Sequence, residues 1–502
     1  MAISQLGWQT SPQKASNPAA LGAGLFFLSM LGLAAALALS AYSGEAASAL
    51  ALVIAAGGFF LIVAQPSLAI MLLLSTMLLT YPDILAGSGL LTINNVLGFT
   101  LLIVMVVRAY FAHDLRIFRE QEIKLLFGIF FSALLLTMAA EALLPQLAAP
   151  LVVETKLGIF RPARDLTVER FKDFFSRLAF LVFLVHFTPT KRHVKWILLA
   201  LLACILFSLP SALANFFAGT ETYLRVTPAM ELGKDSGWLS NANRFAFMCL
   251  LAISLLFYFS AIAKRKALLL ITTPLILTFI TLLLFSGSRS GLLSLLIAGG
   301  WLFARRGVLT LPARVAILAL GLTVTLALFP TLPPELQERL LNVNPFNPEG
   351  EGSHSTEVRV TTVVESAGIF ARYPLTGVGI GNFRWVNFYY NGNFKPPHNS
   401  YMTSLSEGGL ILPLLYGLLF IVLWKRITKV RKLFYDDPEL PHIGEWLSFY
   451  FVAFLFFSFF ADIWIEELHL YLITGIAIVT YRLGMPTPTE TAYAPSARRV
   501  FH

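Results

Sequence analysis

Long apolar segments separated by polar connections make up most of the chain. Most have about the length, near 20 residues, that an α-helix needs to cross a bilayer, and none alternates with the period of two that marks a transmembrane β-strand. About fourteen such segments can be counted. They lie near residues 20–42, 46–63, 66–81, 94–110, 124–143, 175–189, 195–218, 242–262, 267–286, 290–304, 311–330, 400–424, 447–463 and 467–482. The pattern predicts an all-α polytopic membrane protein, a bundle of about 12–14 transmembrane helices.

The longest polar interval predicts a large helical loop on the outer face of the membrane. Within it, a helix is expected from Pro333 to Leu340, with proline at its start, and a second from Glu357 to Tyr373. The chain therefore divides into five parts. They are a cytoplasmic tail (1–19), a transmembrane helix bundle (20–330), the large periplasmic loop (331–399), the C-terminal transmembrane helices (400–482) and a second cytoplasmic tail (483–502).

Composition and charge support a membrane location. The chain is 57% hydrophobic and 13% charged, whereas soluble domains carry about 25% charged residues. When the segments alternate sides from a cytoplasmic N-terminus, every short basic cluster falls on the cytoplasmic side, as the positive-inside rule requires. The clusters are Arg108, Arg116, Arg119 and Lys124; Lys191, Arg192 and Lys195; Lys264, Arg265 and Lys266; Arg305, Arg306 and Arg314; and Lys425, Arg426, Lys429, Arg431 and Lys432. The net charge of +9 is thus expected to face anionic membrane lipids, with no nucleic acid as partner.

The two cysteines, Cys204 and Cys249, both fall inside apolar segments. This placement predicts neither a structural disulfide nor a cysteine-based metal cluster. We expect no metal and no cofactor.

Arginines on the outer face require an explanation, because the positive-inside rule disfavours them there. Arg289 sits in Ser286-Gly-Ser-Arg-Ser-Gly291, between two apolar segments with almost no room for a loop. Snorkelling toward lipid headgroups is one interpretation. The other interpretation is an anion-binding site. A guanidinium binds phosphate oxygens through paired hydrogen-bond donors, and the small neighbouring residues leave room for a bulky group. Arg359, in the second loop helix, and Arg244 are further outward cations that an ordinary solvated surface would also explain.

His398 stands at the end of the long loop, after Pro396 and Pro397 and one residue before an apolar segment begins. A lone histidine in a loop is usually structural or simply exposed. The position of His398, however, is restricted by the two prolines before it and the predicted helix after it. Asn399 is expected to cap the following helix, which leaves the imidazole at the positive helix end. That position favours a lowered pKa and the neutral, proton-accepting form. The other histidines have less defined positions; they are His113, His186, His193, His354, His442, His469 and His502.

Gly377, Gly379 and Gly381 resemble a phosphate-binding loop but follow a predicted helix rather than a strand. The pattern favours a turn that folds the loop back onto the membrane over a dinucleotide site.

Four segments in this order resemble the O-antigen ligase and O-antigen polymerase superfamily, over roughly residues 170–425. They are Ser240-Asn-Ala-Asn-Arg-Phe-Ala246; Ser286-Gly-Ser-Arg-Ser-Gly291; Arg359 with Tyr373-Pro-Leu-Thr-Gly-Val-Gly-Ile-Gly381; and His398-Asn-Ser-Tyr401 with Glu407-Gly-Gly-Leu410. The resemblance implies an inverting, metal-independent glycosyltransferase of the bacterial inner membrane whose active site faces the periplasm. Its donor would be a glycan linked to undecaprenyl pyrophosphate, and its acceptor a hydroxyl on a glycan or on lipid A–core. The predicted helix count departs from the family, because many members have about twelve spans.

The resemblance implies pyrophosphate binding for Arg289 and Arg359, further substrate contacts for Arg244 and Asn399, and acceptor activation for His398. General chemistry agrees, since fixed cations can neutralise a departing pyrophosphate and a single positioned base can activate a hydroxyl. Glu365 and Glu407 are both available to orient the imidazole.

Several functions remain open. Within the family, the acceptor is lipid A–core (a ligase, which we favour), another lipid-linked glycan (a polymerase) or a protein hydroxyl. A lipid-linked glycan transporter is the main rival of another class. Transporters usually show internal pseudo-symmetry and helices broken near the midplane, and neither is evident in this sequence.

Overall fold

A computed structural model describes residues 65–78, 93–112, 116–144, 163–207, 242–263, 268–304, 353–434, 436–465 and 467–485, with a few single positions between 209 and 337. Among these residues every regular element is helical, which confirms the predicted all-α fold. The predicted segments 20–42, 46–63 and 311–330, the first loop helix and both tails lie wholly or largely outside the described residues.

The helices of the first part of the chain follow the predicted apolar segments, except that α8 begins twelve residues before the predicted start at 175. They are α3 (Pro66–Leu78), α5 (Ile93–Ala112), α6 (Gln121–Leu143), α8 (Ala163–Phe187), α9 (Lys191–Phe207), α11 (Ala242–Ile262), α12 (Leu269–Phe285) and α13 (Arg289–Ala304), with short 3-10 helices η2 (Arg116–Arg119) and η7 (Phe329–Thr331). The later helices are α16 (Ser353–Arg372), α17 (Phe383–Asn391), α18 (Ser400–Gly408), α19 (Ile411–Leu433), α20 (Leu440–Phe457) and α21 (His469–Gly484). The sequence did not predict α17, and the single segment expected at 400–424 is two helices that meet at Gly408 and Gly409.

Four helices of the described chain, α6, α11, α19 and α20, are long and apolar enough to cross a membrane. Others are apolar but shorter, among them α3 and α12. Side chains such as Leu135, Leu270 and Ile421 leave more than half of their surface uncovered. A helix that is apolar on its outward as well as its inward face is typical of a lipid environment. The membrane fold is thus confirmed, and the total of 12–14 spans stays a prediction.

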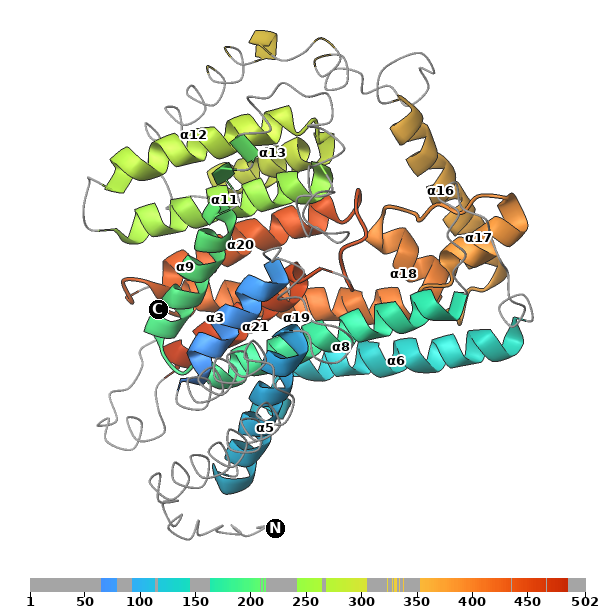
Figure 1. The fold of residues 1–502 in the computed structure, drawn as a ribbon, viewed down its shortest axis with the longest axis horizontal. Helices are drawn as coiled ribbons and strands as arrows, with labels where there is room; N and C mark the ends of the chain where they lie inside the picture. The colour runs from blue at the N-terminus through green and yellow to red at the C-terminus, as the bar shows by residue number, and fades with distance from the viewer. Residues whose placement is uncertain are drawn as a thin grey trace, which may run out of the picture.

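Helix α19 lies in the middle of the bundle, against α6, α20 and α21. Helix α20 continues the packing to α11 and α13, and α21 continues it to α8. Buried aromatic and aliphatic side chains, including Phe247, Phe454 and Leu419, fill the shared core. Figure 1 shows α16, α17 and α18 together at one end of this bundle.

Ion pairs join several of the connections that are predicted to be cytoplasmic. Arg426 binds Glu122 at 2.5 Å and Glu120 at 2.7 Å, and Arg482 binds Glu120 at 2.7 Å. Lys191 pairs with Asp437 and Lys195 with Glu439. The first set of pairs ties the start of α6 to α19 and α21, and the second ties the start of α9 to the connection before α20.

The glycine-rich segment after α16 is a turn, as the sequence predicted, and it packs on α18. The amide of Val378 donates to the Ser406 carbonyl at 3.0 Å, and that of Gly379 donates to the Glu407 carbonyl at 2.9 Å. On the bundle side, the Ile380 amide donates to Thr137 of α6 at 2.9 Å. The turn therefore fixes the loop to α18 and to the bundle at the same place.

Candidate functional site

His398 has a backbone conformation that is rare for its residue type. Its φ is +51°, and it is the sole non-glycine residue with a positive φ in the described chain. Such a conformation persists only where the surroundings impose it, and it is common at functional sites. Asn399 is the N-cap of α18, as predicted: its side-chain oxygen accepts from the amides of Tyr401 at 3.0 Å and Met402 at 3.1 Å. Ser400 is fixed as well, because its amide donates to the Ser458 carbonyl at 2.9 Å.

Three cations surround the imidazole. His398 is exposed at the surface as a residue, yet the protein around the imidazole still excludes part of the water from it. Burial, followed by Arg359, Arg384 and Lys395, lowers the pKa of His398 to about 4. The pKa of His398 is therefore lowered, as the sequence predicted, and the causes are burial and fixed cations. The neutral imidazole, which accepts protons, is the stable form at neutral pH.

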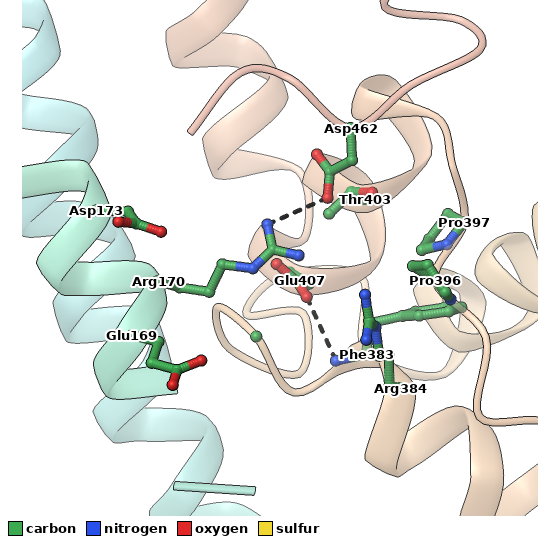
Figure 2. A pocket seen from close by; sticks show the side chains of 11 residues that line it. Glu169, Arg170, Asp173, Phe383, Arg384, Pro396, Pro397, Thr403, Glu407 and Asp462 are labelled. Atoms are coloured by element: carbon green, nitrogen blue, oxygen red, sulfur yellow. Dashed lines mark hydrogen bonds and ion pairs between the residues drawn. The ribbon is translucent and has the colours of Figure 1, made fainter. Parts of the chain in front are cut away.

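A pocket of about 90 Å³, partly open to the outside, lies beside the loop that leads to this histidine (Figure 2). Its walls come from α8, the glycine turn, α17, the loop before His398, α18 and the connection between α20 and α21. The lining residues are Glu169, Arg170, Asp173, Gly381, Phe383, Arg384, Pro396, Pro397, Thr403, Glu407 and Asp462. Arg170 reaches across the pocket to Asp462, with Nη1 and Oδ2 3.3 Å apart.

The sequence interpretation missed most of these residues. Asp462 offered a signal, since a lone carboxylate inside a predicted apolar segment marks a functional candidate. Glu169, Arg170 and Asp173 lie just before a predicted span, and their helical register places them on one face of α8. Nothing in the sequence connects this face with the loop more than two hundred residues later.

The two carboxylates proposed to orient His398 have other partners. Glu365 accepts hydrogen bonds from Asn387 at 2.7 Å and Asn393 at 2.8 Å, which ties α16 to α17. Glu407 accepts from the Phe383 amide at 3.4 Å. Within the described chain, no hydrogen bond joins either carboxylate to His398. Burial raises the pKa of Glu407 to about 7, an effect that nearby Arg170 reduces.

Arg289 and Arg244 belong to a second polar group, at the starts of α13 and α11. Asn243 accepts hydrogen bonds from the hydroxyls of Ser288 at 2.7 Å and Ser290 at 3.1 Å, so the two helix starts are joined around Arg289. Arg244 is paired with Glu467 at 2.7 Å. The predicted site residues therefore fall into two groups. Arg359 and Asn399 lie beside His398, and Arg289 and Arg244 belong to the second polar group.

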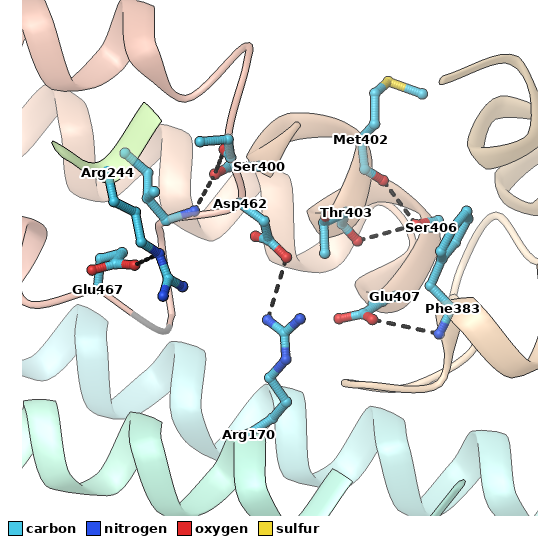
Figure 3. A network of polar contacts seen from close by, with 12 residues as sticks. Arg170, Arg244, Phe383, Ser400, Met402, Thr403, Ser406, Glu407, Asp462 and Glu467 are labelled. Atoms are coloured by element: carbon cyan, nitrogen blue, oxygen red, sulfur yellow. Dashed lines mark hydrogen bonds and ion pairs between the residues drawn. The ribbon is translucent and has the colours of Figure 1, made fainter. Parts of the chain in front are cut away.

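The connection between α20 and α21 touches both groups (Figure 3). The Ser400 hydroxyl donates to the Ala461 carbonyl at 2.8 Å and accepts from the Ile463 amide at 2.9 Å. Four to six residues further on, Glu467 pairs with Arg244. One short segment therefore positions the start of α18, directly after His398, and a cation of the second group.

Both cysteines are free and buried, so neither forms a disulfide. In the described part of the chain, no three histidine, cysteine or acidic side chains gather in a way that would hold a metal ion.

Residues 274–417 match the family model described as O-antigen ligase. The matched region contains Arg289, Arg359 and His398, and it ends before the α20–α21 connection. It is narrower than the resemblance seen in the sequence and begins after Arg244. No curated protein matches the chain.

Proposed function

Because residues 274–417 match the family model described as O-antigen ligase, we propose that this membrane protein is a glycosyltransferase that moves a glycan from undecaprenyl pyrophosphate to a hydroxyl acceptor. The reaction takes place on the periplasmic face of a bacterial inner membrane, and the favoured acceptor is lipid A–core. The observation that carries the proposal is His398, held at a positive φ and made neutral by its surroundings.

His398 acts as the general base. Its neutral ring nitrogen takes the proton of the acceptor hydroxyl while the hydroxyl oxygen bonds to the anomeric carbon of the donor sugar. The bond from that carbon to the pyrophosphate oxygen breaks, and undecaprenyl pyrophosphate leaves with the electron pair. Because the acceptor attacks opposite the leaving group, the anomeric configuration inverts.

An imidazole with a pKa of about 4 is a weak base in the free protein. A pyrophosphate bound beside Arg359 changes this, because its negative charge offsets the cation that lowers the pKa. Donor binding would thus raise the pKa of His398 toward its ordinary range and prepare the base only when a substrate is present.

The arginines hold the leaving group. Paired guanidinium donors match the oxygens of a pyrophosphate, and their fixed charge stabilises the negative charge that grows as the bond breaks. Arg359 acts from the His398 side, and Arg289 and Arg244 act from the second polar group. Asn399 uses its side-chain oxygen as the cap, which leaves its amide nitrogen for a substrate oxygen.

Reconstitution tests the function directly. The full-length protein in proteoliposomes, supplied with a polyprenyl-pyrophosphate-linked glycan and lipid A–core, is expected to yield glycosylated lipid with inverted linkage and free polyprenyl pyrophosphate. A product in which donor glycans are joined to one another would identify a polymerase instead. Movement of the donor across the membrane without any new glycosidic bond would contradict the proposal.

A further inference from the structure

Two polar atoms in the pocket beside His398 are buried without a partner. Thr403 and Glu407 are 4% and 3% exposed, and both line the pocket. Thr403 Oγ1 and Glu407 Oε2 make no hydrogen bond to any residue that the structure describes. The other carboxylate oxygen, Oε1, accepts from the Phe383 amide, which fixes the direction of the side chain (Figure 2).

The fold explains why these two atoms lie together. Thr403 and Glu407 are four residues apart on α18, so they share one face of the helix. Leaving buried polar atoms unpaired is costly. A bound group that offers a hydroxyl to each of them removes this cost.

The charges around the pocket indicate what kind of ligand fits. Four carboxylates line it, those of Glu169, Asp173, Glu407 and Asp462. Two guanidiniums face them, and one of these, Arg170, is already paired with Asp462. This surplus of negative charge repels a pyrophosphate but suits sugar hydroxyls, which donate hydrogen bonds to carboxylate oxygens.

The pocket also lies next to the reacting groups. Pro396 and Pro397 form part of its wall and lead directly to His398. Arg384 lines the pocket and is one of the cations that lower the pKa of His398. A sugar ring bound here is therefore adjacent to the base and to the place where the glycosidic bond forms.

We propose that this pocket is a glycan subsite in which Thr403 and Glu407 bind the hydroxyls of a sugar next to the bond being made. The inference rests on the proposed transferase function. The sugar belongs to the donor glycan or to the acceptor, and the test separates these two sources. With its pKa raised to about 7, Glu407 is present in both forms at neutral pH, so it can donate or accept.

Carbodiimide labelling tests binding without relying on catalysis. A hydrophobic carbodiimide reacts with protonated buried carboxyls, and mass spectrometry of the full-length protein in proteoliposomes quantifies the adduct at Glu407. The probes are deacylated lipopolysaccharide, the glycan released from the donor, and inorganic pyrophosphate. We expect one of the two glycans to reduce labelling at least fivefold and pyrophosphate to have no effect. Protection by neither glycan, or by pyrophosphate alone, overturns the proposal.

The same measurement on His398→Ala protein separates this proposal from the general-base proposal. Protection by a glycan should persist in that variant, whether or not it transfers. A wild-type protein that is protected by glycan but shows no transfer would contradict the proposed function and leave the subsite supported.

Kinetic analysis provides a second test. Glu407→Gln is expected to raise KM for the glycan that protects by roughly tenfold to hundredfold, the effect of a lost hydrogen bond to a charged group. Thr403→Val removes one hydroxyl at constant volume and should raise the same KM about threefold to tenfold, with kcat and the KM of the other substrate little changed. Thr474→Val, at a buried threonine of α21 that bonds to the Leu470 carbonyl, is the matched control. If the Glu407→Gln protein does not fold, the KM values of the Thr403→Val protein provide the test. An unchanged KM for both glycans, or a loss confined to kcat, overturns the proposal.

Discussion

Gly377 lies directly against the backbone of Glu407. A Cβ at Gly377 would be 2.4 Å from the Glu407 carbonyl oxygen, and the φ of Gly377 is +63°. The turn after α16 and the end of α18 thus approach more closely than any side chain would allow. The wall of the pocket and the position of Glu407 depend on this approach.

Gly377→Ala should therefore loosen the loop from α18 and impair transfer. Gly392 provides the matched control, because it also has a positive φ, +68°, but a Cβ there meets nothing within 4 Å. Gly392→Ala carries only the backbone strain of about 1–2 kcal/mol, whereas Gly377→Ala adds a clash with fixed backbone. Thermal unfolding in detergent measures both variants. Equal losses of stability would contradict the account of this turn.

The cations around His398 should control its pKa. Arg359→Gln removes the larger charge effect and Lys395→Gln a smaller one, so both should raise the pKa of His398 above about 4. Because protonation blocks the ring nitrogens, the acid limb of His398 modification by diethyl pyrocarbonate should move to higher pH in the same order. Lys432→Gln, in the last turn of α19, serves as the control and should leave the limb in place. A limb near pH 6.5 in the wild type would refute the depressed pKa.

Arg289 should not tolerate a change to lysine. A lysine keeps the charge but offers a single ammonium in place of paired donors, so Arg289→Lys is expected to raise KM for the lipid-linked donor and to lower kcat/KM by about tenfold or more. Arg192→Lys, in the first turn of α9, is the control for expression and folding. Near-normal transfer by Arg289→Lys and Arg359→Lys at equal expression would place the pyrophosphate site elsewhere.

The two ends of the bundle should lie on opposite sides of the membrane. Asn391 and Asp436 are both exposed, the first at the end of α17 and the second after α19, while both native cysteines are buried. In intact spheroplasts, an impermeant thiol reagent should label Asn391→Cys and not Asp436→Cys. The reverse pattern would contradict a site that faces outward.

The sequence predicted the elements of this fold better than the way they meet. Apolar segments of membrane-spanning length gave the position of α11 to the residue, because the hydrophobic pattern alone decides where such a helix forms. The break between α18 and α19 was not predicted. It depends on Gly409, whose positive φ and close contact with the Leu375 carbonyl exist only once the loop has folded back.

The candidate site shows the same difference between what local sequence predicts and what only the folded chain brings together. Of its proposed loop residues, His398 was singled out by its placement before a predicted helix and Arg359 by the family resemblance. Arg170 and Asp462 were missed, because their significance comes from a contact between α8 and the α20–α21 connection, 292 residues apart in the chain. Long-range contacts of this kind have no signature in a single sequence.

The most direct test of the general-base proposal is the transfer rate of His398→Ala in proteoliposomes, measured at saturating donor and acceptor. His442→Ala, near the start of α20, is the matched control. Because His398 makes no hydrogen bond to the described residues, its removal should leave folding and donor binding nearly intact. We expect transfer to fall by about 10²- to 10⁴-fold, the contribution of a positioned base, and His442→Ala to retain the wild-type rate. A His398→Ala protein that transfers at more than roughly a tenth of the wild-type rate would show that His398 is not the base.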